Sequence, residues 1–382
     1  MQFRDLHKQY EVLKAEIDAA MVRVASSAHF ISGPEVKELE RELAAYVGVK
    51  HCITCANGTD AITIALRAWG IGKGDAVFVP DFTFFSSGEC PADEGAMPVY
   101  VDVDSRTYNL DPEKLEETVQ RVAAEGKYRP KAVVAVDLFG LPHEHPTVRS
   151  ICDRYGLLLL EDAAQGFGGS IRGQMACSLS DIATTSFFPA KPLGCYGDGG
   201  AIFTDNDDWA DLIRSICVHG KDMSNPDDPN AKYNNVRIGK NSRLDTLQAS
   251  ILLPKLKAFR EYELDRVNEV AAWYTEALHD TPLVLPQIPE GYASSWAQYT
   301  VQLPVGVDRG KIQAELKAAG IPTMVYYAKP MHSQGAFAGT DSAKADCPVT
   351  ERLCGTVLSL PIDPYKTRED VLQVARELGK LL

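Results

Sequence analysis

Short apolar runs separated by amphipathic stretches recur along the first two thirds of the chain. Between several of these runs the apolar residues return at helical spacing, as in 112–125 and 146–155. Because strands that alternate with helices build parallel sheets covered by helices, we expect an α/β fold with a mostly parallel sheet. The run at 200–204 follows the run at 182–188 so closely that its strand is expected to be antiparallel to its neighbours. The expected strands cover residues 51–54, 76–80, 97–102, 131–138, 157–161, 182–188 and 200–204.

The alternation of short apolar runs with amphipathic stretches changes near residue 250. A long helix is expected from about 245 to 278, with Pro254 near its start as the cause of a kink. We therefore expect a large domain over residues 1–250 and a smaller α/β domain over residues 251–382 that includes this linking helix. The polar stretch 222–235 is expected to be a long exposed loop over a site or an interface. The other elements expected in the smaller domain are strand 297–303, helix 309–319, strand 322–327 and helix 368–381.

Lys191 is the first candidate for chemistry, because it lies where an apolar strand pattern gives way to a turn rich in glycine. Partial burial at such a place lowers the pKa of an amine and makes it a nucleophile toward carbonyl groups. The natural partner of a buried lysine is the aldehyde of pyridoxal phosphate (PLP), held as a Schiff base. The alternative is a loop lysine whose stem lies along the surface while its ammonium reaches water.

Further candidates follow the ends of other expected strands. Asp162 could pair with a protonated ring nitrogen or cap a helix, and Gln165, a few residues later, could contact the ring. Gly58 and Thr59 open a helical pattern and could bind a phosphate or simply form a cap. Phe84 could stack on a ring or belong to the core.

The order of phosphate cup, aromatic residue, aspartate and lysine, each after its own strand, resembles the DegT/DnrJ/EryC1 family of sugar aminotransferases. These are PLP enzymes of fold type I, and the likeness extends over nearly the whole chain. Its most specific segments are Glu-Asp-Ala-Ala-Gln at 161–165 and Ser-Phe-Phe-Pro-Ala-Lys-Pro-Leu-Gly at 186–194. The resemblance implies a mostly parallel, seven-stranded sheet in the large domain. One departure is Ala190, where many relatives carry Ser or Thr, so one hydroxyl contact is missing.

The resemblance also implies individual roles. Lys191 would hold PLP and act as general base and acid, while Asp162 would bind the pyridine nitrogen. Gln165 would lie beside the ring, and Phe84 would stack on its other face. The phosphate would be held by Gly58, Thr59 and Ser186, together with Asn241 of a neighbouring subunit, which implies a homodimer with shared active sites. Substrate contacts would come from Arg243, Tyr326, Tyr327 and His332, although Arg243 could equally form a structural ion pair and the others could be packing residues.

Lys191 bears on the activity as well, because sugar dehydratases of this fold lack the Schiff-base lysine. The resemblance therefore implies amino transfer, with a nucleotide-linked ketosugar as acceptor, L-glutamate as donor and pyridoxamine phosphate as intermediate. The nearest likeness is to enzymes that aminate carbon 3 of UDP-2-acetamido-3-keto-glucuronic acid in polysaccharide biosynthesis. Two alternatives remain. One is a carbon-4 aminotransferase acting on a UDP- or dTDP-linked 4-keto-6-deoxysugar, and the other is a regulatory protein that binds PLP or a sugar without turnover.

Composition excludes other classes of protein. The formal net charge of -13 argues against nucleic-acid binding, and no apolar run approaches the ~20 residues that span a bilayer. Without a signal-peptide pattern at the N-terminus, a cytoplasmic protein is expected. The nine cysteines are scattered, so neither a disulfide framework nor a metal site is expected, and Cys52 and Cys55 should face opposite sides of their strand. His143 and His145 are expected in a loop, not as metal ligands.

Overall fold

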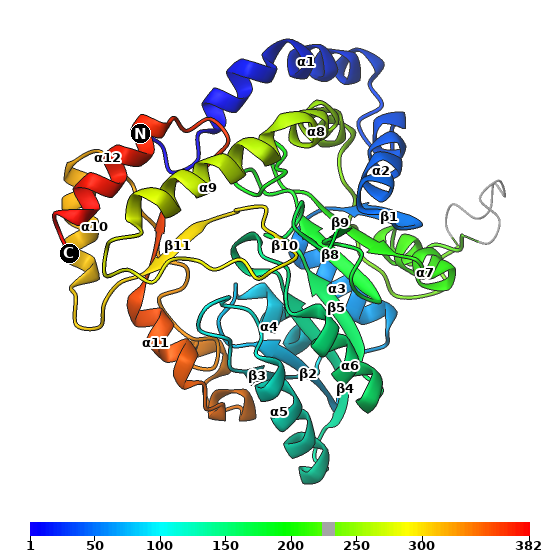
Figure 1. Cartoon of the computed structure of the whole chain (residues 1–382). Coiled ribbons are helices and arrows are strands. Elements are labelled where there is room, and N and C mark those ends of the chain that lie inside the picture. Colours follow the sequence, from blue (N-terminus) through cyan, green and yellow to red (C-terminus); the bar gives the residue numbers. More distant parts are fainter. Residues whose placement is uncertain (224–233) are drawn as a thin grey trace.

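The computed structural model describes residues 1–223 and 234–382 and is built around a seven-stranded sheet (Figure 1). The strand order is β1-β9-β8-β5-β4-β2-β3. Strand β9 is antiparallel to both β1 and β8, whereas the other pairings are parallel. The mostly parallel sheet and its antiparallel last strand are therefore confirmed. The strands are β1 (His51–Cys55), β2 (Asp75–Pro80), β3 (Met97–Val101), β4 (Arg129–Val136), β5 (Leu158–Asp162), β8 (Ile182–Ser186) and β9 (Gly200–Thr204).

The sheet is buried on both faces, which explains why its strands are visible in the sequence as apolar runs. Along β4, Val134 and Val136 pack into one hydrophobic cluster, and Val133 packs into another on the opposite face. Cys52 and Cys55 likewise belong to clusters on opposite sides of β1, as expected. All nine cysteines are buried and free.

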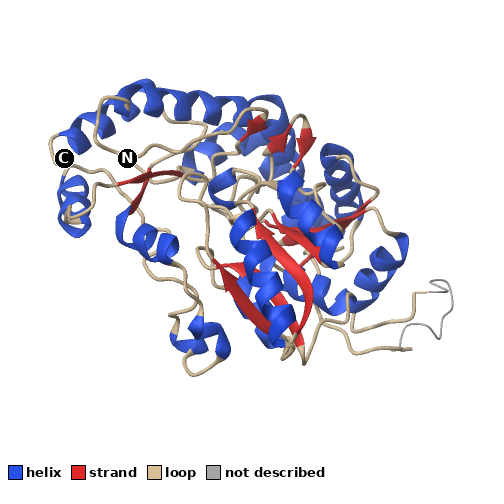
Figure 2. Ribbon diagram, turned by 60° about the horizontal axis from the view of Figure 1, so that its bottom comes forward, coloured by secondary structure: helices blue, strands red, loops and turns tan. Residues whose placement is uncertain are grey.

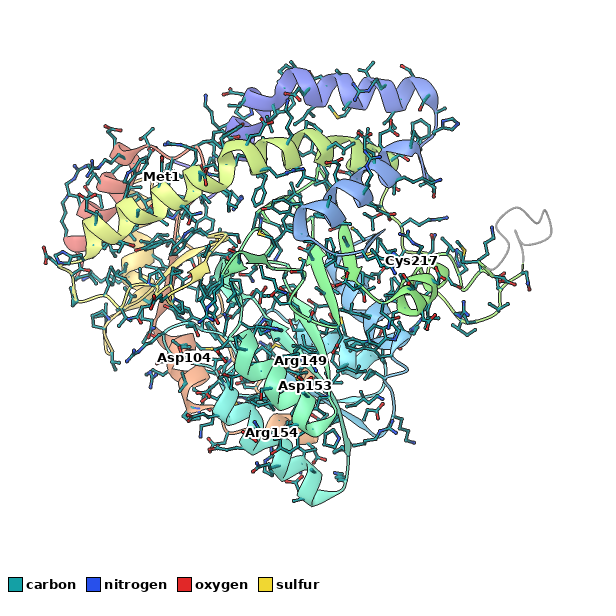
Figure 3. All side chains as sticks on the ribbon, turned by 45° about the vertical axis from the view of Figure 1, so that its right-hand side comes forward. Met1, Asp104, Arg149, Asp153, Arg154 and Cys217 are labelled. Carbon is teal, nitrogen blue, oxygen red and sulfur yellow. The ribbon has the colours of Figure 1, made fainter. Side chains whose placement is uncertain are left out.

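Helices cover both faces of the sheet (Figure 2). The outer surface of α6 carries ion pairs, among them Arg149 with Asp153 at 2.7 Å and Arg154 with Glu116 (Figure 3). Among the described helices, none is long and apolar enough to cross a membrane. The helices of this part of the chain are α1 (Leu6–Ser27), α2 (Pro34–Val47), α3 (Gly58–Ala68), α4 (Ser86–Asp93), α5 (Pro112–Glu125), α6 (His145–Tyr155) and α7 (Asp207–Cys217).

The long linking helix is present but consists of three pieces. An α-helix, α8 (Thr246–Ala258), passes through a π-helical turn at Phe259–Glu263 into a second α-helix, α9 (Leu264–Leu278). Pro254 lies inside α8, where its ring removes one backbone donor. Helix α1 lies along α8, and Leu13 and Ile17 pack against Ile251 (Figure 1).

The C-terminal part has a smaller sheet of its own. Strand β11 (Tyr299–Gln302) pairs antiparallel with β12 (Val357–Leu360), and both pack with α9, α10 (Arg309–Ala318) and α12 (Arg368–Gly379). The strand expected at 322–327 is wrong, since only Met324 forms a single bridge, with Ser359. Beyond that bridge the chain turns away, so its apolar residues pack against the large sheet instead of pairing. The remaining elements are α11 (Pro348–Thr356) and a three-stranded sheet of β6 (Ser170–Ile171), β7 (Gln174–Met175) and β10 (Tyr292–Ala293).

The structure describes only the two ends of the stretch that is expected to be an exposed loop. Residues 224–233 of the predicted loop at 222–235 lie outside the described residues. At its described margin, Lys221 forms a bridge with Asn235. The division into domains at residue 250 remains a prediction.

Candidate active site

The carboxyl ends of the parallel strands bring the sequence candidates to one edge of the sheet. Asp162 is the last residue of β5 and Ser186 the last residue of β8, while Gly58 begins α3 beside them. In open α/β sheets, ligands bind outside this edge. The candidates that were separated by more than a hundred residues in sequence are therefore neighbours in space.

Lys191 is half-buried in the loop after β8. Within the described residues its ammonium makes neither a hydrogen bond nor an ion pair. Burial lowers the pKa of Lys191, the charge of Asp162 opposes this effect, and the charge of Arg4 lowers the pKa further. An unpaired lysine amine with a lowered pKa is ready to act as a nucleophile or a base.

Asp162 is 5% exposed and is held at both carboxylate oxygens. Ser87 donates its hydroxyl hydrogen to Oδ2 at 2.9 Å, and the backbone N–H of Ala164 donates to Oδ1 at 3.2 Å. Burial raises the pKa of Asp162, while these two hydrogen bonds and the charge of Lys191 lower it. No helix begins directly after β5 in the described chain, so the alternative of a helix cap is wrong.

Gln165 connects the sheet edge to the C-terminal part of the chain. Its Oε1 accepts the backbone N–H of Phe139 at 2.9 Å, and its amide donates to the Tyr327 hydroxyl at 3.1 Å. Burial raises the pKa of Tyr327, so this phenol stays protonated at neutral pH. Gln165 and Tyr327, both predicted from the sequence, are thus in direct contact.

Gly58 and Ser186 form a close-fitting cradle at the start of α3. A Cβ atom added to Gly58 would lie 2.7 Å from the Cβ of Ser186, so only glycine fits there. Asn57 caps the helix by accepting the N–H of Asp60 at 2.7 Å. The N–H groups of Gly58 and Thr59 have no acceptor in the described part of the chain. These donors at the positive end of a helix suit a phosphate.

Phe84 is 54% exposed, which excludes the alternative that it belongs to the core. Its ring centroid lies 6.4 Å from that of Tyr327, at an interplanar angle of 43°. A large apolar ring in water beside polar site residues is a surface on which a flat ligand can stack.

His332 is fixed by a carboxylate that the sequence did not point out. Asp81, directly after β2, accepts hydrogen bonds from the backbone N–H of His332 at 2.8 Å and from its Nδ1 at 2.7 Å. The other ring nitrogen, Nε2, lies 3.6 Å from Glu351. Asp81 therefore holds the segment after Tyr327 against the large sheet.

Asn241, Arg243 and Tyr326 lie at the margin of the site. Arg243 donates to the amide oxygen of Asn241, which is exposed, so the ion pair considered for Arg243 is not formed within the described residues. The neighbouring Lys240 pairs with Asp60 of α3 at 2.9 Å, which places this segment beside the start of that helix. Tyr326 is half-buried, and its ring centroid is 6.4 Å from that of Phe3.

A buried polar cluster lies behind Asp162. His143 lies in the loop before α6, as expected, whereas His145 is the first residue of that helix and not part of the loop. His143 is fully buried, and its Nδ1 lies 2.8 Å from Oδ1 of Asp137. Burial raises the pKa of Asp137 to about 7, opposed by the neighbouring Glu161 and by the backbone N–H of His143. The N–H of Asp137 donates to the carbonyl of Asp162 at 3.0 Å. His143 thus partners one oxygen of Asp137, whereas Asp137 Oδ2 and His143 Nε2 are buried without a hydrogen bond to a described residue.

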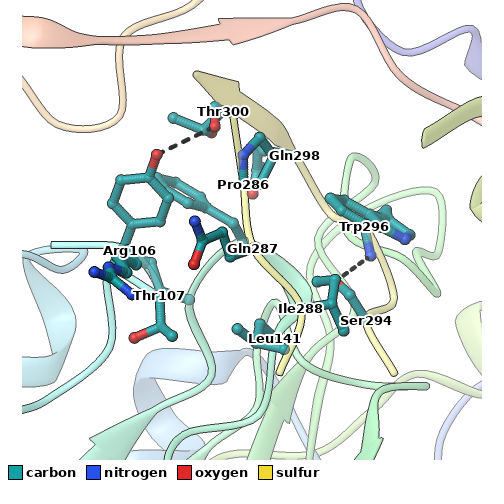
Figure 4. A pocket seen from close by; sticks show the side chains of 13 residues that line it. Arg106, Thr107, Leu141, Pro286, Gln287, Ile288, Ser294, Trp296, Gln298 and Thr300 are labelled. Atoms are coloured by element: carbon teal, nitrogen blue, oxygen red, sulfur yellow. Dashed lines mark hydrogen bonds between the residues drawn. The ribbon is translucent and has the colours of Figure 1, made fainter. Parts of the chain in front are cut away.

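A separate cavity of about 20 Å³ lies between the chain after β3 and the strand β11 (Figure 4). A space of this size holds one water molecule, not a cofactor or a sugar. Gln298 lines it and has a buried Oε1 without a hydrogen bond to any described residue. None of the residues predicted from the sequence for the active site lines this cavity.

The residues at the sheet edge fit PLP at each of its ends. The cradle at Gly58 offers donors to a phosphate, Asp162 offers a buried carboxylate to a ring nitrogen, and Lys191 offers a free amine to an aldehyde. This donor set on a seven-stranded, mostly parallel sheet defines a PLP-dependent transferase of fold type I. Residues 11–379 match the model of the DegT/DnrJ/EryC1/StrS aminotransferase family, and the chain belongs to that family.

Individual relatives agree with this assignment. The chain is 47% identical over 365 residues to the UDP-2-acetamido-2-deoxy-3-oxo-D-glucuronate aminotransferase of Pseudomonas aeruginosa, covering 96% of each chain. It is 40% identical over 379 residues to a pleiotropic regulatory protein of Geobacillus stearothermophilus, covering 98% of this chain and 97% of the other. Its structure is similar to that of S. venezuelae DesV in complex with a ketimine intermediate, with a TM-score of 0.91, 35% identity and coverage of 99% and 97%. The expectations of an aminotransferase and of PLP as cofactor are confirmed.

Proposed function

We propose that the protein transfers the amino group of L-glutamate to carbon 3 of a nucleotide-linked ketosugar of the UDP-2-acetamido-3-keto-glucuronic acid type. The relative from Pseudomonas aeruginosa, named for such an acceptor, supports this substrate class over nearly the full length of both chains. Nucleotide sugars are cytoplasmic metabolites, so we assign the reaction to the cytoplasm. A carbon-4 keto-sugar is the alternative acceptor.

The observation that carries this proposal is the unpaired amine of Lys191 beside the buried carboxylate of Asp162. PLP, when bound, supplies an aldehyde that condenses with amines and a ring that withdraws electrons from the amine-bearing carbon. Burial keeps a fraction of Lys191 neutral, so its Nζ can take the proton from the amine-bearing carbon of the donor. In the second half-reaction the same Nζ delivers a proton to the former ketone carbon of the sugar.

Asp162 holds the opposite end of the ring in its protonated form. A carboxylate that is buried and hydrogen-bonded by Ser87 gives a strong interaction with a positive ring nitrogen, because little water screens it. Gln165, itself fixed by Phe139 and Tyr327, orients the ring from one side. Phe84 covers the other face and excludes water from it.

We propose that Gly58, Thr59 and Ser186 bind the phosphate through backbone N–H groups and hydroxyls. In a homodimer, Asn241 of the neighbouring subunit completes this phosphate site, and its exposure supports such a contact. Arg243, Tyr326, Tyr327 and His332 are proposed to contact the nucleotide sugar. Of these, His332 has its orientation fixed by Asp81, and its Nε2, which lies 3.6 Å from Glu351, is the ring nitrogen that Asp81 does not bind.

The absorption spectrum of the purified protein tests the amine chemistry. We expect a band near 420 nm, typical of PLP bound to a lysine, that decreases when L-glutamate is added. Lys191→Ala should lack this response, while Lys257→Ala, an exposed lysine of α8, should behave as the wild type. A wild-type spectrum that is indifferent to L-glutamate contradicts the proposed donor.

The acceptor is tested by mass spectrometry. The protein is incubated with ¹⁵N-labelled L-glutamate and UDP-linked 3-keto or 4-keto sugars, and the sugar product is examined for the label. Label on the 3-keto sugar supports the proposal. Label on the 4-keto sugar alone supports the alternative acceptor, and a protein that binds PLP but labels neither sugar acts without turnover, as a regulatory protein would.

A further inference from the structure

Arg4 has an unusual position for an arginine near the N-terminus. It lies in the segment before α1, and the N-terminus of that segment is near α12 (Figure 1). The carbonyl of Phe3 accepts the N–H of Ile362, so this segment is attached to the C-terminal part of the chain. Nη2 of Arg4 lies 3.4 Å from the carbonyl oxygen of Pro192, the residue after Lys191. Arg4 therefore approaches the lysine loop from the side of the smaller sheet.

The Arg4 side chain is half-buried, and its guanidinium has few partners. Nη1 is buried and has no hydrogen-bond acceptor in the described chain, and the bond to Pro192 is long for an N–H donor. Arg4 also forms no ion pair with any described residue. A guanidinium carries five N–H donors, and leaving them unpaired away from water costs free energy. Such a cost in a native structure indicates a missing partner.

Two acidic groups, Asp363 and Glu263, act on Arg4 through their charges, but both already accept hydrogen bonds from other residues. Asp363 accepts the N–H of Asp5 at 2.9 Å and pairs with Lys366. Glu263 accepts two hydrogen bonds from Gln9, at 2.9 and 3.2 Å, and another from Tyr365. Their charges favour the protonated arginine without forming a contact to it. No acidic group of the described residues contacts Arg4, which leaves its guanidinium available to an external anion.

The location of Arg4 indicates which chemical class of anion it would bind. The charge of Arg4 acts on Lys191, and Phe3 lies against Tyr326, one of the proposed substrate contacts. The planar fork of an arginine matches a carboxylate in a bidentate geometry. Both reactants of the proposed function carry carboxylates, and in a two-step transfer they occupy the position beside Lys191 in turn. One arginine can therefore bind the carboxylate of each reactant in turn.

We propose that Arg4 is the carboxylate receptor of the active site, binding the carboxylate of the reactant that stands beside Lys191. This inference rests on the proposed function, since it takes its ligand class from the reactants of amino transfer. The shared chemistry is a carboxylate, supplied either by the amino donor or by the uronic acid group of the sugar. Arg4 lies in the N-terminal segment and not in the expected smaller domain at residues 251–382.

Calorimetric binding to the PLP-loaded protein tests the proposal without requiring turnover. The probes are glutarate, which carries the two carboxylates of L-glutamate but no amine, UDP-glucuronic acid, and UDP-glucose as the neutral counterpart of the sugar. Arg4→Gln should weaken binding of at least one carboxylate probe roughly 10- to 100-fold, the range of a lost charged hydrogen-bond pair, and leave UDP-glucose unchanged. Arg4→Lys keeps the charge but loses the fork, so several-fold weaker binding is expected. Arg376→Gln, an exposed arginine of α12, is the matched control.

The two sources of the carboxylate give different results. Weaker binding of glutarate alone assigns Arg4 to the donor, and weaker binding of UDP-glucuronic acid alone assigns it to the sugar. Unchanged binding of both probes in Arg4→Gln and Arg4→Lys overturns the proposal, as does a wild-type protein that binds neither. The melting temperature and the absorption near 420 nm of each variant identify misfolding. If L-glutamate leaves the wild-type spectrum unchanged while glutarate binding depends on Arg4, the proposed function fails and the carboxylate site stands.

Discussion

Ser87 and Asp162 are joined by a hydrogen bond of 2.9 Å, although the first lies on α4 and the second ends β5. The Ser87 hydroxyl is fully buried and lies 3.1 Å from the hydroxyl of Thr83. A short chain of hydroxyl groups thus leads from the segment after β2 to the carboxylate proposed to bind the ring nitrogen. This contact lowers the pKa of Asp162 against the effect of burial, and so favours its ionised form.

Ser87→Ala should therefore raise the pKa of Asp162 and weaken its interaction with a protonated ring. We expect a roughly tenfold lower kcat, since a hydrogen bond to a charged group contributes about 1.5–3 kcal/mol. Because Asp162 must be ionised, the acid limb of the kcat profile should move to higher pH. Steady-state kinetics as a function of pH measure both effects. Ser86→Ala, at the preceding buried serine, is the control, and equal profiles for the two variants contradict a role for the Ser87 contact.

The cradle at the start of α3 predicts a steric effect on cofactor binding. Gly58→Ala places a Cβ atom 2.7 Å from the Cβ of Ser186, so either α3 or the end of β8 has to move. The backbone donors then no longer converge, and we expect PLP affinity to fall at least tenfold, measured by equilibrium dialysis. Gly355→Ala is the matched control, because its added Cβ meets no atom within 4 Å. If Gly58→Ala binds PLP as the wild type does, the cradle is not the phosphate site.

Lys255 gives a prediction about stability and pH. It is 1% exposed, and its ammonium donates to the carbonyl of Gly194 in the lysine loop. Burial lowers the pKa of Lys255 to about 8 from its usual 10.5. Between these two values the unfolded chain binds one more proton than the folded chain, so the free energy of unfolding rises with pH. The full effect is roughly 3 kcal/mol.

Lys255→Met should remove this dependence. The quantity to measure is the free energy of unfolding of wild type minus variant, which should increase between about pH 8 and 10.5. The difference is needed because burial raises the pKa of cysteines such as Cys52 and Cys177, which act in the opposite direction. Lys257→Met, an exposed lysine on the same helix, should keep the wild-type slope. A flat difference contradicts the prediction, because it means that folding does not lower the pKa of Lys255.

Much of the fold was predictable because its strands are buried on both faces, as in β4, and such strands appear in a sequence as apolar runs. The position of Asp162 and Lys191 at strand ends followed from the same pattern. The segment 322–327 shows the limit of that reasoning, because an apolar run packed against a neighbouring sheet resembles a paired strand. Contacts such as Ser87 with Asp162, or His143 with Asp137, depend on how distant elements pack, and no spacing in the chain predicts them.

If two subunits share each active site, two inactive variants should regain activity when they form a mixed dimer. Lys191→Ala removes the amine, and Asn241→Ala removes the proposed phosphate contact of the neighbouring subunit. In a mixed dimer, the Lys191→Ala subunit supplies its Asn241 to the active site of the Asn241→Ala subunit, which still has Lys191. One of the two sites is then complete. Random reassortment of equal amounts makes about half of the dimers mixed, so about a quarter of wild-type activity should return.

The measurement is amino transfer after the two variants are mixed, mildly denatured and refolded together at limiting PLP. Each variant refolded alone serves as the control for residual activity. If Asn241 acted within its own subunit, both sites of a mixed dimer would lack one essential group and no activity would return. The exposure of Asn241 suits a residue that reaches a neighbouring subunit, whereas the Lys240–Asp60 pair places its segment beside the start of α3 of its own subunit, so the mixed dimer distinguishes the two arrangements.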